Sequence, residues 1–106
     1  MGYRVRKIDS NQPAITKKFR DLGCSVAILS SVGNGLPDLL ISKWIGRESG
    51  QPQRWTALIE IKDGSKPPSG RKLTPDEAAF HYAWQGELFI IESEKQAEDL
   101  INSLLP

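Results

Sequence analysis

The segment from Arg54 to Lys62 constrains the fold most, because its side chains suit the two faces of one β-strand. Side chains point alternately to opposite faces of a strand. One face then carries three apolar residues, which are Ala57, Ile59 and Ile61. The other face carries Leu58, Glu60 and Lys62. We therefore expect the apolar face in the core, and a carboxylate and an ammonium group projecting together near the strand's end.

A second strand is predicted from Asp38 to Trp44, and the turn-forming residues from Gly46 to Pro52 connect the two strands as a hairpin. Asp38 stands at the beginning of its strand. Antiparallel pairing can bring the beginning of one strand beside the end of its partner. The hairpin therefore predicts that Asp38, Glu60 and Lys62 converge on one point.

The remaining elements follow from apolar periodicity and from capping residues. They are a helix capped by Ser10 or Asn11 and ended by Gly23, a short buried strand from Ser25 to Ser30, a loop from Asp63 to Leu73, a helix capped by Thr74 with Glu77 in its capping box, a strand from Leu88 to Ile91, and a last helix with Ala97, Leu100, Ile101 and Leu104 on one face. The order αβββαβα predicts an α/β fold, in which helices flank a mixed central sheet. At 106 residues we expect a single domain, residues 1–106.

Composition limits the functional classes. The net charge is only +1, so bulk charge gives no sign of a nucleic-acid binder, and any basic surface must come from local clusters. Cys24 is the only cysteine, which excludes an intrachain disulfide and a zinc site built from several thiolates. No apolar run is long enough for a membrane span or a signal peptide, so we expect a cytoplasmic protein.

Asp38, Glu60 and Lys62 together suit phosphodiester hydrolysis. Two carboxylates can hold Mg²⁺ or Mn²⁺, which prefer oxygen ligands, and the backbone carbonyl of Ile61 can add another. The cation activates a water and polarises the phosphate, while the lysine stabilises developing charge. The simpler alternative is an exposed ion pair on a half-buried strand. A Gly-rich loop before Asp38 and a basic loop after Lys62 favour the catalytic interpretation.

Several flanking residues are candidate DNA contacts. Ser31 and Asn34 lie in the Gly-rich loop, whereas Lys66, Arg71 and Lys72 lie in the basic loop and could contact phosphates. For the basic loop, a solvated loop without function is an equal alternative. His81 is the only histidine, and we expect no catalytic role for it beyond a phosphate contact.

Three sequence blocks resemble a known family. Ser31-Val32-Gly33-Asn34-Gly35-Leu36-Pro37-Asp38-Leu39-Leu40, Glu60-Ile61-Lys62-Asp63-Gly64 and Lys72-Leu73-Thr74-Pro75 resemble the stand-alone virus-type replication-repair nuclease (VRR-NUC) domains of phages. That family lies within the PD-(D/E)XK nuclease superfamily, whose core has the same element order. The resemblance covers most of the chain, from about Asp9 to the last helix.

The resemblance implies a restriction-endonuclease-like fold and a Mg²⁺- or Mn²⁺-dependent DNA endonuclease, with relatives that act on branched DNA such as Holliday junctions. Asp38 and Glu60 take the positions of metal ligands, and Lys62 that of the catalytic lysine. The chain departs from the family pattern twice. Relatives often carry a metal-binding glutamate on the first helix, where we expect Ala14, and a glutamine early in the second helix, where this chain has Asp76 and Glu77.

Two other classes of function remain open. Ala14 keeps a nuclease-like DNA-binding module without cleavage as an alternative, and a structural subunit that associates through the hairpin is another. For the nuclease we expect a homodimer on duplex or branched DNA, because one active site cuts one strand per binding event. Trp44 and Trp55, which flank the predicted turn, are the expected dimer contacts.

Overall fold

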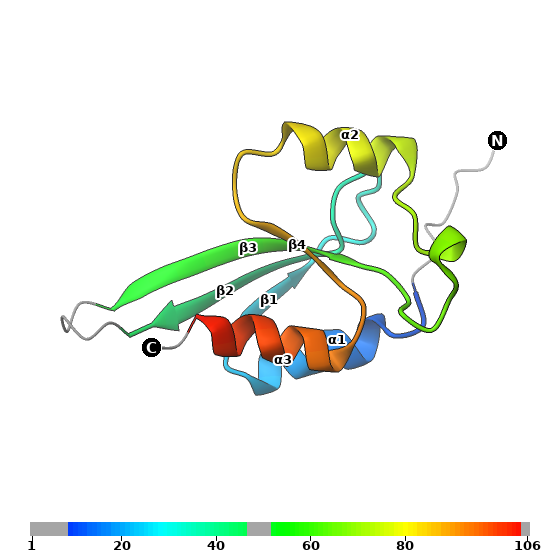
Figure 1. The fold of residues 1–106 in the computed structure, drawn as a ribbon. Helices are drawn as coiled ribbons and strands as arrows, with labels where there is room; N and C mark the ends of the chain where they lie inside the picture. Colours follow the sequence, from blue (N-terminus) through cyan, green and yellow to red (C-terminus); the bar gives the residue numbers. More distant parts are fainter. Residues whose placement is uncertain (1–8, 47–51, 105–106) are drawn as a thin grey trace.

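The computed structural model describes residues 9–46 and 52–104, and its element order is αβββαβα, as predicted (Figure 1). The helices are α1 (Gln12–Asp21), α2 (Pro75–Ala83) and α3 (Glu94–Ser103), with a short 3₁₀ turn, η1, at Pro68–Gly70. The strands are β1 (Ser25–Ile28), β2 (Leu39–Ile45), β3 (Gln53–Ile61) and β4 (Leu88–Ile91). They form one sheet in the order β1-β2-β3-β4.

The predicted mixed sheet and hairpin are both confirmed. β1, β2 and β3 pair antiparallel, and β4 joins β3 in parallel. The hairpin register pairs Leu39 with Ile59 and Ile45 with Gln53. Most of the predicted turn, Gly46 to Pro52, lies outside the described residues. The prediction that the first strand is buried is wrong. β1 is a short edge strand, and its side chains are mostly exposed.

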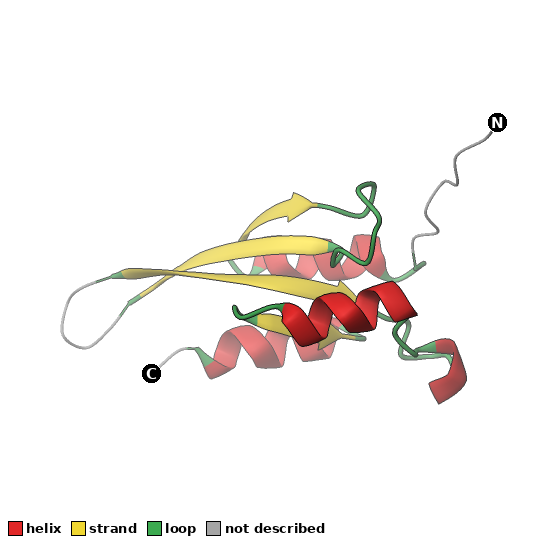
Figure 2. Ribbon diagram, turned by 90° about the horizontal axis from the view of Figure 1, so that it is seen from above, coloured by secondary structure: helices red, strands yellow, loops and turns green. Residues whose placement is uncertain are grey.

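One face of the sheet is packed against two helices. Figure 1 shows α1 and α3 side by side against this face, and Figure 2 shows the same arrangement from above. The fully buried core side chains include Ile15, Phe19, Leu39, Ile41, Ile59, Ile61 and Ile101. Ala57, Ile59 and Ile61 are buried as the alternating pattern predicts. The packed face therefore fixes the register of β3 and sends Glu60 to the opposite face.

The opposite face is covered only in part. α2 lies on that side of the sheet (Figure 1), while Trp44, toward the far end of the hairpin, is 59% exposed. The register places Trp44 opposite Arg54 and Lys43 opposite Trp55, so the two tryptophans point to different faces. Trp55 packs against the core beside Phe89. The prediction that both tryptophans share one dimer surface is therefore wrong for Trp55.

The helix ends follow the predicted capping with one exception. Thr74 and Glu77 form the predicted capping box at the start of α2. Gly23 follows the end of α1 with a φ of 91°, which suits glycine. Asn11 occupies the N-cap of α1 but makes no side-chain cap; its amide donates to the carbonyl oxygens of Lys62 and Glu92 instead. None of the helices described here is long and apolar enough to cross a membrane.

Candidate active site

Asp38, Glu60 and Lys62 meet where β2 begins and β3 ends, as the hairpin predicts. The Asp38 N–H donates to the carbonyl of Ile59 at 2.9 Å, and the Asp38 carboxylate accepts the N–H of Ile61 at 2.7 Å. Asp38 thus extends the hairpin pairing by one residue, and β3 holds both its backbone and its side chain. The ammonium group of Lys62 lies 3.9 Å from the Glu60 carboxylate.

The two carboxylates are buried beside each other. Asp38 is 6% exposed and Glu60 is 1% exposed. Burial raises the pKa of Glu60 to about 9, and repulsion by Asp38 and Glu77 acts in the same direction, while Lys62 opposes it. A closely spaced, buried pair of carboxylates favours a bound proton or a bound cation.

Glu77 is a site residue whose contact with Lys62 the sequence interpretation missed. Its carboxylate lies 2.7 Å from the ammonium group of Lys62, and the same oxygen accepts the N–H of Thr74 at 2.8 Å. The capping box therefore does two things: it begins α2 and it holds the lysine in place. The available signal was the capping box itself, which fixes the direction of Glu77.

His81 also reaches the site, which the sequence interpretation did not expect. Its Nε2 atom lies 3.3 Å from the Glu60 carboxylate. Burial lowers the pKa of His81, which favours the neutral imidazole. His81 follows Glu77 by four residues, so both side chains lie on the face of α2 that turns toward the sheet. That spacing was readable from the sequence once Glu77 was placed.

The Gly-rich loop lies between β1 and β2 and is in close contact with the start of α2. Gly35 has a φ of 80°, and a methyl group on its Cα would collide with the carbonyl of Asp76 at the start of α2. Only glycine permits both the conformation and the contact. Ser31 and Asn34 lie in this loop with exposed side chains, as a DNA contact requires.

The structure corrects the prediction that Ala14 stands where relatives carry a glutamate on the first helix. Gln12, and not Ala14, faces the site: it is 4% exposed, and its amide donates to the Ser30 hydroxyl at 2.6 Å. The Ser30 hydroxyl in turn lies 3.5 Å from the Asp38 carbonyl. Two residues along a helix correspond to a rotation of about 200°, so Ala14 points elsewhere.

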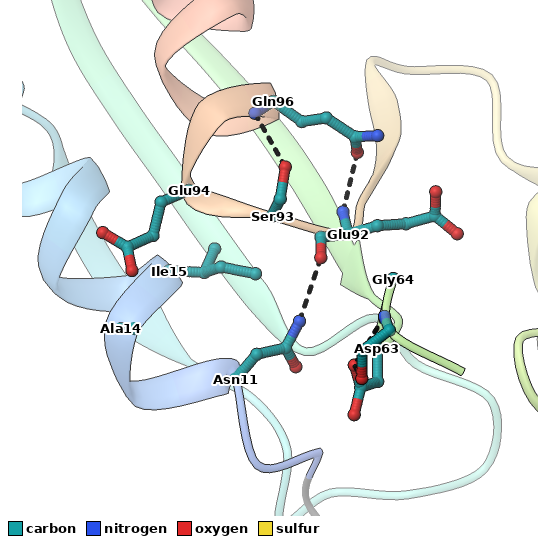
Figure 3. Close-up of a pocket in the computed structure, with 10 residues that line it drawn as sticks. Asn11, Ala14, Ile15, Asp63, Gly64, Glu92, Ser93, Glu94 and Gln96 are labelled. Carbon is teal, nitrogen blue, oxygen red and sulfur yellow. Dashed lines mark hydrogen bonds between the residues drawn. The ribbon is translucent and has the colours of Figure 1, made fainter.

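Ala14 lines a depression of about 460 Å³ between the beginnings of α1 and α3 (Figure 3). Asn11 lies in the same depression, where one of its two amide hydrogen bonds reaches Glu92 (Figure 3). The depression therefore does not contain Asp38 or Glu60, and Ala14 gives no information about metal binding at those carboxylates.

Ion pairs tie two residues of the basic loop to the rest of the fold, which argues against a freely solvated loop. Arg71 lies 3.1 Å from the Glu92 carboxylate, and Lys66 lies 3.7 Å from Asp9. Lys72 is exposed. Of the three basic residues predicted to contact DNA, Lys72 is the one for which the described residues provide no ion pair.

The donor set fits a hard divalent cation held mainly by carboxylate oxygens and water. Within the described residues, no three histidine, cysteine or acidic side chains form a ready-made metal cage. Asp38 and Glu60 offer two carboxylates, and the backbone of Ile61 lies beside them. Mg²⁺ commonly binds to one or two carboxylates and keeps several waters.

Comparison with known proteins bears on the fold and on the class of domain. The sequence matches no family profile and no curated protein. Among solved structures it is similar to a VRR_NUC domain, with 25% sequence identity and a TM-score of 0.57. The match covers 89% of this chain and 97% of the VRR_NUC chain, so the similarity extends over nearly the whole of both folds. The structural match supports the VRR-NUC resemblance and, with it, a nuclease domain.

Proposed function

We propose that this chain is a metal-dependent DNA endonuclease of the PD-(D/E)XK superfamily, resembling the phage type of VRR-NUC domain. The observation that carries the proposal is the convergence of Asp38, Glu60 and Lys62 at one end of the β2–β3 hairpin. Buried carboxylates beside a lysine are costly for stability, so their presence at one point favours a catalytic role.

Asp38, Glu60 and the carbonyl of Ile61 would hold Mg²⁺ or Mn²⁺. When bound, the cation supplies a more acidic water and polarises the phosphoryl oxygen. To act as a ligand, Glu60 would have to be deprotonated, and its proton would be released to solvent. The hydrogen bond from the Ile61 N–H to the Asp38 carboxylate keeps that carboxylate in a fixed orientation.

Lys62 would stabilise the negative charge that develops on the phosphate in the transition state. Glu77 keeps the ammonium group in place through their 2.7 Å ion pair. His81 orients Glu60 through the 3.3 Å contact, as residues around a metal ligand commonly do.

The finer parts of the proposal concern substrate and assembly. We propose activity on duplex and branched DNA, including Holliday junctions, by a homodimer, since two symmetric sites can cut two strands of a symmetric substrate. Ser31, Asn34, Lys66, Arg71 and Lys72 are the proposed contacts to flanking DNA. Arg71 would have to leave Glu92 to reach a phosphate. The proposed location is the cytoplasm, that of the host cell for a phage protein.

The test is a cleavage panel. Purified protein is incubated with supercoiled plasmid, linear duplex, flap and four-way-junction DNA, each with Mg²⁺, Mn²⁺ or EDTA. We expect cleavage with either cation and none with EDTA. Light scattering should give twice the chain mass. Absence of cleavage under every condition, with a folded protein, would contradict the proposal.

A nuclease-like DNA-binding module without cleavage is the second candidate. One observation favours it: α1 offers the site a neutral amide, that of Gln12, which reaches the Asp38 backbone carbonyl through the Ser30 hydroxyl, whereas relatives often carry a glutamate on this helix. One carboxylate fewer weakens the attraction for a second cation. Binding of junction DNA without cleavage in Mn²⁺ would select this candidate.

A further inference from the structure

The half of the sheet that α2 leaves uncovered forms a continuous surface, which we call the open face. The strand registers place seven residues on it: Ser25, Ala27, Leu40, Ser42, Trp44, Arg54 and Thr56. All but Ser42 are exposed. The open face lies on the same side of β3 as Glu60, because residues an even number of positions apart share a face.

Two adjoining depressions run across the open face. One, of about 330 Å³, is lined mainly by apolar and hydroxyl groups that include Ala27, Leu40 and Thr56. The other, of about 300 Å³, is lined by Arg54, Trp44, Ser25 and Ser42, beside Gly23 and Lys43. The Lys43 side chain belongs to the other face of the sheet, where its ammonium group donates to the carbonyl of Leu22 at 2.9 Å. The two depressions share Ser25 and Ser42, so they form a single groove. No acidic side chain is among the described residues that line it.

The cationic end of the groove is pre-arranged. The guanidinium carbon of Arg54 lies 4.8 Å from the centre of the Trp44 ring, in cation–π contact. At the other end, the Thr56 hydroxyl donates to the Ser42 hydroxyl at 3.2 Å. An exposed indole beside an arginine, with hydroxyls and small apolar groups between, suits the bases and phosphates of an unpaired nucleic-acid strand.

The distance to the catalytic residues fits such a strand. Glu60 lies six positions beyond Arg54 on β3, which corresponds to about 20 Å along an extended chain. At a stacked spacing of about 3.4 Å per nucleotide, this span corresponds to roughly six nucleotides.

We propose that the open face binds an unpaired DNA strand that runs from the scissile phosphate at Glu60 to the Arg54–Trp44 pair. This inference rests on the proposed nuclease function and locates the surface that an unpaired arm of its DNA would follow. A second copy of the chain is the competing occupant. A two-fold contact would bring the same patch from both subunits together, with the Arg54 guanidinium of each and no acidic side chain of the groove to balance them.

The experiment measures how the effect of a mutation depends on arm length. Fluorescein-labelled flap DNA is made with an unpaired arm of about 3 or about 12 nucleotides, on either side of the expected span. Binding is measured in EDTA for wild type, Trp44→Ala and Arg54→Gln. Lys17→Ala is the matched control, because it removes an exposed charge from α1 on the packed side of the sheet.

We expect Trp44→Ala and Arg54→Gln each to weaken binding of the long-arm DNA by at least about fivefold, and to leave the short-arm DNA and the Lys17→Ala control unchanged. Equal affinities for wild type and both variants, or equal losses on both arms, would overturn the inference. A halved mass by light scattering for Trp44→Ala without DNA would assign the face to a second copy. The nuclease function is tested separately by cleavage of the short-arm DNA in Mn²⁺. If wild-type protein does not cleave this DNA, the nuclease function is contradicted, whether or not binding depends on arm length.

Discussion

The two halves of β3 differ sharply in environment although they belong to one continuous strand. From Gln53 to Thr56 no side chain is buried, whereas every residue from Ala57 to Ile61 is buried. β4 pairs only with the second half, beginning at Leu58. α1 and α3 cover one face of the sheet and α2 lies over the other (Figure 1). The second half is therefore enclosed on both faces, while the first half continues into a two-stranded arm.

The difference shows how position in the sheet determines what a polar residue can do. Glu60 and Arg54 are both ionisable residues on the same face of β3. Because Glu60 is buried, its carboxylate needs partners, which are Lys62, His81 and Asp38. Arg54 stays in solvent with Trp44 and remains available for binding. We therefore assign chemistry to the enclosed half and substrate capture to the arm.

The largest expected effect comes from the enclosed half. Asp38→Asn and Glu60→Gln should each lower the cleavage rate by about 1,000-fold or more, because a bound cation contributes several kcal/mol to transition-state stabilisation. Both variants keep the side-chain shape, so the fold should survive. The measurement is plasmid cleavage in Mn²⁺ together with circular dichroism.

The matched control is Asp99→Asn, which removes an exposed carboxylate from α3. It should cut DNA at the wild-type rate. Wild-type activity of purified Asp38→Asn or Glu60→Gln would remove the distinction between the two halves of β3.

A smaller loss is expected at Lys62. Lys62→Met should slow cleavage by about 100-fold, which is typical for removal of one charge-stabilising donor. Mn²⁺ binding by calorimetry should persist, because the lysine is not a ligand. Lys95→Met, an exposed site on α3, is the control. Loss of Mn²⁺ binding with normal turnover would reverse the assigned roles.

The sequence predicts the packed side of the molecule well because that side depends on periodicity. The alternation at Ala57, Ile59 and Ile61 and the stripe at Ala97 and Ile101 each identify a buried face, and all five residues are buried. Local rules also predicted the capping box of α2 correctly. The convergence of Asp38 with Glu60 followed from hairpin pairing alone.

The sequence predicts the α2 side less well, because that side depends on contacts between distant segments. The capping box and the four-residue spacing fix how Glu77 and His81 project from α2, but nothing local shows that α2 lies over the end of β3. Gln12 was missed for a related reason: choosing between Gln12 and Ala14 required knowing which side of α1 faces Asp38. The hairpin tryptophans were assigned to one surface although odd and even positions of a strand point to opposite faces.

An intermediate effect is expected where the Gly-rich loop meets α2. Gly35→Ala and Gly33→Ala both force alanine into a left-handed conformation, at a cost of about 1–3 kcal/mol each. Only Gly35→Ala also collides with the carbonyl of Asp76, since no atom lies within 4 Å of a methyl group at Gly33. Urea unfolding should therefore show a larger loss of stability for Gly35→Ala, and cleavage should fall because Glu77 and His81 move. Equal losses for the two variants would mean that α2 is not held by this contact.

The smallest expected effect is the pH dependence of stability without metal. The raised pKa of Glu60, about 9 against an ordinary value of 4.5, means that the folded protein keeps a proton that the unfolded chain releases as the pH rises. This contribution to stability is fully present below about pH 4.5 and is lost progressively up to about pH 9.

The melting temperature in EDTA should therefore fall more steeply over this range in wild type than in Glu60→Gln, which has no proton to release. Glu98→Gln removes a partly exposed carboxylate of α3 that lies 3.9 Å from Lys18, and it should keep the wild-type slope. Saturating Mn²⁺ should flatten or reverse the slope, because the cation replaces the proton on Glu60 and binds more tightly as the pH rises. Identical slopes for wild type and Glu60→Gln in EDTA would show that Glu60 is already ionised, and the enclosed half of β3 would then be less distinct from the arm than we infer.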